Sequence, residues 1–206
     1  MLQPTLEGTP QGGIISPTLA NATLDGMERM LKKKYKVSYV NGKLYYPKVN
    51  LVRYADDFIV TADRRETLLE IKEMLTAFLK ERGLTLSEEK TLITHISDGF
   101  DFLGFNVRKY NGTLLIKPSK KSQKRFTDKL HEVVLTKGKA LSQQELIEKI
   151  NPIIRGWGNY YSHVVSKEVF CRCDHILINQ LKRWSYRRHT NKSRKWIRNK
   201  YFIRKG

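Results

Sequence analysis

Hydrophobic residues in the first part of the chain recur at helical spacing in two segments. Residues 17–33 follow a Ser-Pro pair that suits a helix start, and their apolar side chains repeat with a helical period. Residues 65–82 show the same period and are followed by Gly83, a residue typical of helix C-termini. The pattern therefore predicts two amphipathic helices in this part of the chain.

Between and after these helices the pattern shortens to β-prone runs. Asn41-Gly42 divides residues 35–48 into a small predicted hairpin, and a second Asn-Gly pair joins two later runs. Two runs flank Asp56 and Asp57, so both carboxylates are expected at a tight turn between antiparallel strands. The two runs that flank the aspartates are residues 51–54 and 58–61, and the second Asn-Gly pair joins residues 100–108 and 113–116. Residues 84–86 and 92–96 are further predicted strands.

After Pro118 the pattern becomes helical. A capping box at residues 142–145 marks one helix start, and Asn151-Pro152 is expected to interrupt that helix because proline lacks a backbone donor. The other predicted helices span residues 122–135, 152–165, 167–189 and 193–200. The predicted fold class is therefore α+β, with a mixed domain at residues 1–117 and an all-α domain at residues 118–206.

The net charge of +19 is concentrated in the second part of the chain. Residues 1–116 hold 16 Lys and Arg against 14 Asp and Glu, whereas residues 117–206 hold 23 against 6. Such a surplus suits a polyanionic partner, either nucleic acid or an anionic membrane surface. No apolar run approaches the ~20 residues that span a bilayer, and no signal peptide is recognisable. We therefore predict a cytoplasmic protein that binds nucleic acid and has no membrane partner.

The adjacent Asp56 and Asp57 are the first candidates for chemistry. Two carboxylates on one turn repel each other unless a divalent cation neutralises them, and nucleotidyl transfer uses two Mg²⁺ ions about 3.5–4 Å apart. A metal-dependent phosphoryl-transfer site therefore fits the pair. The alternative is a solvated Asp-Asp turn, which the dipeptide by itself favours.

The neighbours of the aspartates favour the metal site. Residues 51–60, Leu-Val-Arg-Tyr-Ala-Asp-Asp-Phe-Ile-Val, resemble the catalytic hairpin of reverse transcriptases. Residues 8–17, Gly-Thr-Pro-Gln-Gly-Gly-Ile-Ile-Ser-Pro, are similar to the glycine-rich motif of the group II intron branch, and paired glycines let a backbone approach a nucleotide closely. The resemblance implies metal binding and catalysis by Asp56 and Asp57. It also implies template or nucleotide contacts from Pro10, Gln11, Gly12, Gly13, Tyr54 and Ala55.

Two later segments resemble further motifs of the same family. Residues 83–91 resemble a motif whose lysine is a candidate proton donor to pyrophosphate, which implies a catalytic role for Lys90; an ordinary surface lysine is the alternative. Residues 100–105 resemble the primer grip, an apolar hairpin that supports the end of the growing strand, and a plain core strand is the alternative. The implied primer-grip residues are Phe102, Leu103 and Gly104.

The basic part of the chain extends the resemblance to intron maturases. Residues 151–161 look like the thumb or maturase signature of group II intron proteins, and residues 187–193 are similar to its later block. Residues 182–206 contain 11 Lys and Arg and no acid, so RNA binding is expected to depend strongly on salt. An aromatic residue here could stack on a base, although packing is the commoner role. The predicted RNA contacts are Arg155, Trp157, Lys182, Arg183, Arg187, Arg188, Lys192 and Lys195.

The resemblance begins just upstream of the glycine-rich motif, so the family's fingers and first palm segment are expected to be missing. In the family that segment holds a further metal-binding aspartate. We therefore predict an incomplete two-Mg²⁺ site and no DNA synthesis by this chain alone.

The expected function is that of an RNA-directed DNA polymerase and intron maturase, truncated at the N-terminus. Its expected partners are intron RNA, an RNA template, a DNA primer, deoxynucleotides and a separate N-terminal reverse transcriptase fragment. The alternative is a non-catalytic maturase-like module that binds intron RNA during splicing. A fragment, a split protein and a decayed gene product all stay open as interpretations of the chain.

Overall fold

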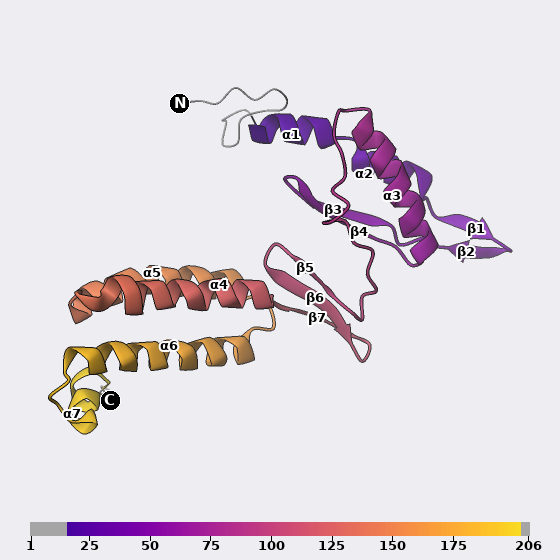
Figure 1. Cartoon of the computed structure of the whole chain (residues 1–206). Helices are drawn as coiled ribbons and strands as arrows, with labels where there is room; N and C mark the ends of the chain where they lie inside the picture. Colours follow the sequence, from indigo (N-terminus) through magenta and orange to yellow (C-terminus); the bar gives the residue numbers. More distant parts are fainter. Residues whose placement is uncertain (1–15, 203–206) are drawn as a thin grey trace, which may run out of the picture. The chain divides into compact units, whose positions relative to one another are not determined.

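The computed structural model describes residues 16–202, with the backbone alone at positions 16, 17, 19 and 20. The chain divides into two compact units, Met1–Ile93 and Thr94–Gly206, whose elements are labelled in Figure 1. Helices and antiparallel sheets occur together, which confirms the predicted α+β class. The predicted boundary between the family's two domains, after residue 117, stays a prediction. No helix in the described part is long and apolar enough to cross a membrane.

The first helical segment consists of two helices. Helix α1 spans Ser16–Leu24 and helix α2 spans Met27–Lys34. Between them Gly26 has a φ of 95°, a left-handed conformation that a continuous α-helix does not contain. The prediction of one helix over residues 17–33 is therefore wrong, because the apolar period continues across a glycine that turns the backbone.

Two hairpins and a long helix complete the first unit. The hairpin predicted at Asn41-Gly42 is confirmed, with φ values of 50° and 73° at its two turn residues. The helix predicted over residues 65–82 is confirmed, and its core face packs on α2 around Met27, Leu31 and Ile71. The elements are β1 (Ser38–Val40), β2 (Lys43–Tyr45), β3 (Asn50–Tyr54), β4 (Asp57–Thr61) and α3 (Arg65–Lys80).

The segment that follows α3 contains neither of the two strands predicted for it. The Leu84 N–H donates to the Leu79 carbonyl at 2.9 Å, so residues 84–86 begin as the continuation of a helix end. Residues 92–96 form no strand ladder, and their backbone is linked to the next sheet by the Lys109 N–H, which donates to the Ile96 carbonyl at 2.9 Å. Both predictions fail because a β-prone run needs a neighbouring strand to pair with.

The second unit opens with a three-stranded antiparallel sheet. Its strands are β5 (Phe100–Phe102), β6 (Phe105–Tyr110) and β7 (Thr113–Pro118), in that order across the sheet. A turn at Leu103 and Gly104, with φ values of 49° and 83°, divides the single strand predicted over residues 100–108 into two. The turn predicted at the second Asn-Gly pair is confirmed between β6 and β7.

Four helices follow the sheet. The capping box is confirmed, because Ser142 and Glu145 bond each other's backbone N–H at the start of α5. Helix α5 continues through Pro152, so the predicted interruption and the separate helix over residues 152–165 are wrong. Packing of Leu146 and Ile150 in the core outweighs the donor that the proline lacks. The elements are α4 (Lys120–His131), a π-helical turn η1 (Glu132–Thr136), a 3₁₀ turn η2 (Lys137–Lys139), α5 (Gln143–Tyr161), α6 (Lys167–Arg188) and α7 (Arg194–Tyr201).

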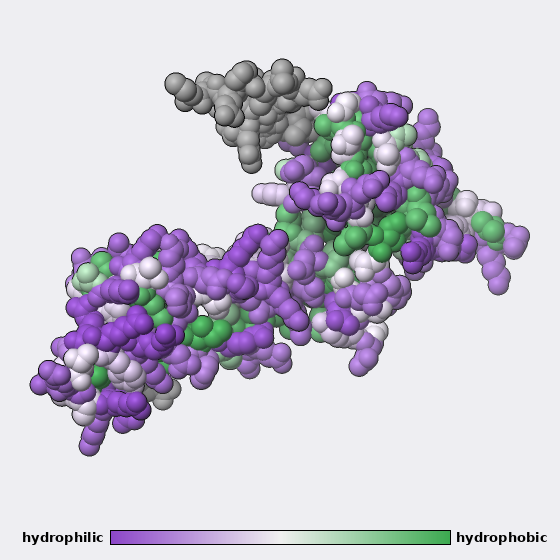
Figure 2. Space-filling view, viewed as in Figure 1, coloured by the Kyte–Doolittle hydropathy of each residue, from purple (hydrophilic) through white to green (hydrophobic). Residues whose placement is uncertain are grey.

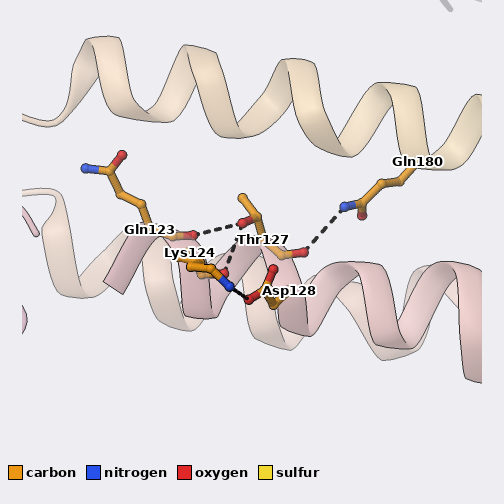
Figure 3. A network of polar contacts seen from close by, with 5 residues as sticks. All are labelled: Gln123, Lys124, Thr127, Asp128 and Gln180. Carbon is orange, nitrogen blue, oxygen red and sulfur yellow. Dashed lines mark hydrogen bonds and ion pairs between the residues drawn. The ribbon is translucent and has the colours of Figure 1, made fainter. Parts of the chain in front are cut away.

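Helices α4 and α6 are joined by an apolar core and by a short polar link. The Trp184 indole is buried and donates from Nε1 to the Gly138 carbonyl at 2.7 Å. Figure 3 shows the polar link, in which Gln180 of α6 donates from Nε2 to the Thr127 carbonyl of α4 at 3.4 Å. Gln180 is 7% exposed, and its Oε1 atom has no hydrogen-bond partner among the described residues. This buried acceptor is a weak point in an otherwise apolar contact.

Candidate active site and nucleic-acid interface

The two aspartates lie at the tip of the β3–β4 hairpin, as predicted. The strand register pairs Tyr54 with Asp57, so Ala55 and Asp56 form the two-residue turn. Ala55 has a φ of 55°, a left-handed conformation that costs energy for a residue with a Cβ atom. Both carboxylates are exposed. The structure therefore presents two adjacent oxygen ligands on a backbone that is tightly constrained.

The two faces of this hairpin have different roles. Leu51, Phe58 and Val60 share one face and pack against the core formed by α2 and α3. Tyr54 and Asp57 lie on the opposite face, where the Tyr54 side chain is 65% exposed. The helices thus position the hairpin from one side, and the side that carries Asp57 stays open to solvent.

Arg53 braces the turn, and sequence reasoning did not identify it. Its Nη1 atom donates to the Ala55 carbonyl at 3.1 Å and to Asn21 Oδ1, on helix α1, at 2.9 Å. One guanidinium therefore joins the strained turn to the helix that follows the glycine-rich motif. The available signal was the presence of an arginine directly before the Tyr-Ala-Asp-Asp sequence.

The donor set fits a divalent cation in part. Carboxylate oxygens are the ligands that Mg²⁺ prefers, and Asp56 and Asp57 supply them. Among residues 16–202 no cluster of three or more His, Cys, Asp or Glu side chains could hold a metal ion. Asp25 is paired with Arg29, and Asp63 accepts hydrogen bonds from Tyr45, so neither is directed to the turn. A further carboxylate is needed for a two-metal site.

Two other predicted elements of this site receive less structural support. Pro10, Gln11, Gly12 and Gly13 lie outside the described residues. Lys90 is exposed in a turn closed by the Thr91 N–H, which donates to the Ser87 carbonyl at 2.9 Å. Its ammonium group has no ion pair within the described part of the chain. No described carboxylate therefore neutralises the charge of Lys90, and its catalytic role stays a prediction.

The predicted primer-grip turn is bonded to helix α5. Tyr160 donates from its hydroxyl to the Leu103 carbonyl at 2.8 Å, and Tyr161 donates to the Gly104 carbonyl at 3.0 Å. The Phe105 ring stacks on Tyr160 with ring centroids 5.0 Å apart. A Cβ atom at Gly104 would lie 2.6 Å from the Tyr161 hydroxyl oxygen, so only glycine fits this position. The turn is therefore held by residues far away in the sequence.

Trp157 is half-buried in the same contact. Its indole stacks on Phe126 with centroids 4.3 Å apart and an interplanar angle of 11°. Its Nε1 atom donates to Ser122 Oγ at 3.3 Å, and that oxygen is hydrogen-bonded to the Tyr161 hydroxyl at 2.7 Å. Since one ring face and the indole donor are both engaged, Trp157 acts first as a packing residue.

Helices α6 and α7 form a basic surface that contains a cavity of about 460 Å³. Lys182 and Lys195, two of the predicted RNA contacts, line this cavity together. Sequence reasoning did not identify its other lining residues, because it did not group residues across two helices. They are Tyr186, Arg194, Arg198 and Phe202. Four cations and two aromatic rings at one concave site suit a phosphate next to a base.

The remaining predicted RNA contacts are exposed but differ in their bonds. Arg155, Arg183, Arg187 and Lys192 are on the surface, and Lys192 also lies 5.6 Å from the centroid of a tryptophan ring. Arg188 donates to the Leu141 carbonyl and lies over the Trp184 ring, so its guanidinium also stabilises the fold of its own unit. Figure 2 shows that hydrophilic residues cover most of the visible surface of these helices.

Comparison with known families accounts for both units. Residues 2–107 match the family described as reverse transcriptase (RNA-dependent DNA polymerase). Residues 123–202 match the family described as the group II intron, maturase-specific domain. The chain belongs to the group II intron reverse transcriptase and maturase family. The aspartate turn, Lys90 and the Leu103–Gly104 turn lie in the first match, and all the predicted RNA contacts lie in the second.

Several curated proteins are similar to this member of the family. The group II intron-encoded protein LtrA of Lactococcus lactis is 30% identical over 239 residues, which covers 76% of this chain and 40% of LtrA. Protein YkfC of Escherichia coli is 32% identical over 120 residues, 48% of this chain and 32% of YkfC. An uncharacterized 91 kDa protein in the cob intron of Schizosaccharomyces pombe is 27% identical over 242 residues, 83% and 30% respectively. The chain spans less than half the length of each of these relatives.

Proposed function

We propose that this chain supplies the catalytic aspartates, the primer grip and the RNA-binding helices of an RNA-directed DNA polymerase that also acts as an intron maturase. The observation that carries the proposal is the aspartate turn, which is exposed, strained and braced by Arg53. Its expected substrates are an RNA template, a DNA primer and deoxynucleotides, and its expected partner is intron RNA. The protein would work in the cytoplasm, bound to nucleic acid.

Each group has a defined part in the proposed reaction. Asp56 and Asp57 would hold Mg²⁺, which when bound supplies charge neutralisation for the attacking and leaving oxygens. Arg53 keeps the turn in the conformation that directs these carboxylates. Lys90 would donate a proton to the departing pyrophosphate. The turn at Leu103 and Gly104, held by α5, would support the primer end.

We expect the chain by itself to make no DNA, because the described residues supply two carboxylates to a site that needs more. The test is primer extension with an RNA template, Mg²⁺ and deoxynucleotides. The assay is run with the chain alone and with the family's fingers and first palm segment added in trans. Synthesis that appears only on addition supports the proposal. Robust synthesis by the chain alone would contradict the prediction that its metal site is incomplete.

Asp56→Ala should abolish synthesis in the complemented assay while leaving RNA affinity unchanged. Asp98→Ala is the matched control, because Asp98 is also an exposed turn aspartate, between α3 and β5. If Asp56→Ala leaves synthesis intact, the aspartate turn is not the active site.

The second candidate function is RNA binding without catalysis, which the basic cavity between α6 and α7 favours. In that case Asp56→Ala has no effect on intron splicing, whereas Arg187→Glu and Lys195→Glu each weaken RNA binding about five- to tenfold. Lys139→Glu is the control, because Lys139 is exposed on the same unit and has no ion pair among the described residues. Equal effects at all three positions would indicate that RNA affinity depends only on the net charge of the chain, and would argue against a defined RNA surface.

A further inference from the structure

The β1–β2 hairpin is an element to which no motif of the family was assigned. Figure 1 shows it extending from the first unit at the end opposite to the β3–β4 turn that carries the aspartates. Its register pairs Tyr39 with Leu44 and Ser38 with Tyr45. Because directly opposed residues share a face, Tyr39 and Leu44 lie on one face and Tyr45 lies on the other.

The inner face of this hairpin is fixed to the body of the unit. The Tyr45 hydroxyl donates to the Asp63 carboxylate, at 3.0 and 2.9 Å from its two oxygens, and the Arg64 guanidinium lies 5.0 Å from the Tyr45 ring centroid. The Asp63 N–H donates to the Pro47 carbonyl at 3.2 Å. An isolated two-stranded hairpin is marginally stable in water, so these bonds hold the β1–β2 hairpin in a defined direction.

The outer face is apolar, aromatic and uncovered. Tyr39 is 78% exposed and Leu44 is 45% exposed, and next to the strands Val37 and Tyr46 are 51% and 53% exposed. The Tyr39 ring has no ring, cation or hydrogen-bond partner among the described residues. Figure 2 shows apolar and hydrophilic residues side by side on this hairpin.

A second hairpin of the same chain provides a contrast. Tyr110 also precedes an Asn-Gly turn, between β6 and β7. Its ring, however, has Arg108 at 4.9 Å and Lys117 at 5.6 Å from the centroid. Tyr110 pairs with Thr113 directly beside its turn, whereas Tyr39 pairs with Leu44 one position further from the turn of its own hairpin. Of these two tyrosines, only Tyr39 keeps both ring faces open to a partner.

The charged residues within the segment that forms this hairpin are all positive. Residues 29–55 contain no acidic residue. Lys36, Lys43 and Lys48 are exposed and form no ion pair with any described carboxylate. Three unpaired ammonium groups on this segment are complementary to a polyanion.

We propose that the β1–β2 hairpin is a second nucleic-acid contact, which binds an unpaired strand by stacking a base on Tyr39 and by placing phosphates beside Lys36, Lys43 and Lys48. A paired strand keeps its bases stacked inside the duplex, whereas an unpaired base can lie on an open ring. The contact is independent of the polymerase chemistry, because it lies away from the aspartate turn.

Photo-crosslinking locates this contact directly. A single-stranded RNA that contains 4-thiouridine is irradiated with the full chain, and the tryptic peptides are identified by mass spectrometry. Crosslinks should fall in the peptide of residues 37–43, which contains Tyr39. The peptide of residues 110–120, which contains Tyr110 and continues past Lys117 because trypsin does not cleave before proline, is the control from the other hairpin. Crosslinks confined to residues 110–120 or to the basic helices would overturn the proposal.

Affinity measurements give the second readout. Tyr39→Ala should raise the Kd for single-stranded RNA about five- to tenfold, the equivalent of about one stacked base. Tyr39→Phe, which keeps the ring, should bind with the affinity of the unchanged chain. Tyr110→Ala should change the affinity little. Lys43→Gln should make the slope of log Kobs against log salt concentration less steep by about 0.7, the value for one phosphate contact on a single strand, whereas Lys109→Gln should not.

Three outcomes of these measurements would overturn the proposal. They are equal effects at Tyr39 and Tyr110, loss of duplex binding in place of single-strand binding, and a Tyr39→Ala defect seen only with anionic lipid vesicles. An unchanged far-UV circular dichroism spectrum and thermal midpoint show that each variant is folded. Asp56→Ala should leave the crosslink to residues 37–43 in place, which separates this contact from the proposed catalytic function.

Discussion

Some residues to which the recognised motifs assign no role position the candidate site, and Arg53 is the clearest example. Arg53→Lys removes the planar guanidinium that reaches both the Ala55 carbonyl and the Asn21 side chain. In the complemented polymerase assay we expect kcat to fall about ten- to a hundredfold through misplaced carboxylates, with little change in KM for the primer. Arg82→Lys is the control, because Arg82 donates to the Phe78 carbonyl on α3. A rise in primer KM with constant kcat would show that Arg53 binds substrate instead.

Gln180 is a residue whose replacement should be tolerated. Its Oε1 atom is buried without a partner in the described part, and its one hydrogen bond to the Thr127 carbonyl is long, at 3.4 Å. Gln180→Met should therefore leave the free energy of unfolding unchanged or raise it by up to about 1 kcal/mol. Gln123→Met, whose amide has partners on both its nitrogen and its oxygen, should lower it. Urea denaturation of both variants checks the contrast, and a clear loss of stability in Gln180→Met would refute it.

At the scale of elements, Tyr161 joins the turn between β5 and β6 to helices α4 and α5. Its hydroxyl group is bonded to the Gly104 carbonyl and to Ser122 Oγ, and its side chain is 2% exposed. Tyr161→Phe removes both of these buried hydrogen bonds and should destabilise the unit by about 1–2 kcal/mol, since the Gly104 carbonyl keeps the Ser119 N–H and Ser122 Oγ keeps the Trp157 donor. Tyr110→Phe should cost much less, because Tyr110 is 39% exposed. Thermal unfolding of the two variants makes the comparison, and equal midpoints would contradict it.

Helix α7 is docked partly through His189, whose ring lies 2.7 Å from the Tyr201 hydroxyl oxygen. Burial, and after it the charges of Lys200, Arg188 and Lys192, lower the pKa of His189 below its usual value of 6.5. The unfolded state therefore binds the proton more readily than the folded state. The stabilisation is present above about pH 6.5 and is lost as the pH falls below that value.

The loss of stability between pH 8 and pH 5.5 should consequently be smaller in His189→Gln than in the unchanged chain. Urea denaturation at the two pH values, followed by Trp fluorescence, measures it. His131→Gln, at an exposed position on α4, should behave as the unchanged chain does. An identical pH response in His189→Gln would show that another group is responsible.

At the scale of the whole molecule, local signals predicted much of the fold, and the errors share one cause. The Asn41-Gly42 turn and the Ser142 capping box were predictable because their chemistry lies within a few residues. The break at Gly26 and the turn at Leu103 lie inside continuous apolar patterns, which do not show backbone direction. The passage of α5 through Pro152 depends on core packing that no local pattern reveals.

The candidate site divides in the same way. The position of Asp56 and Asp57 at a hairpin tip followed from the flanking β-prone runs. The contact of Tyr160 with Leu103 did not, since the two residues lie 57 positions apart. The cavity between α6 and α7 was missed for a similar reason, because it is formed by residues from two helices whose packing the sequence does not display.

The bonds from Tyr160 and Tyr161 to the Leu103–Gly104 turn cross from one family match to the other within one compact unit. Modules exchanged between homologues at the end of the reverse transcriptase match would separate the turn from its own tyrosines. A hybrid joined between the two matches, at residues 108–122, would therefore combine a glycine and a helix that were not selected together. A junction at Ile93–Thr94 keeps the turn, the sheet and the helix from one parent, and it is the place to join halves of different intron proteins.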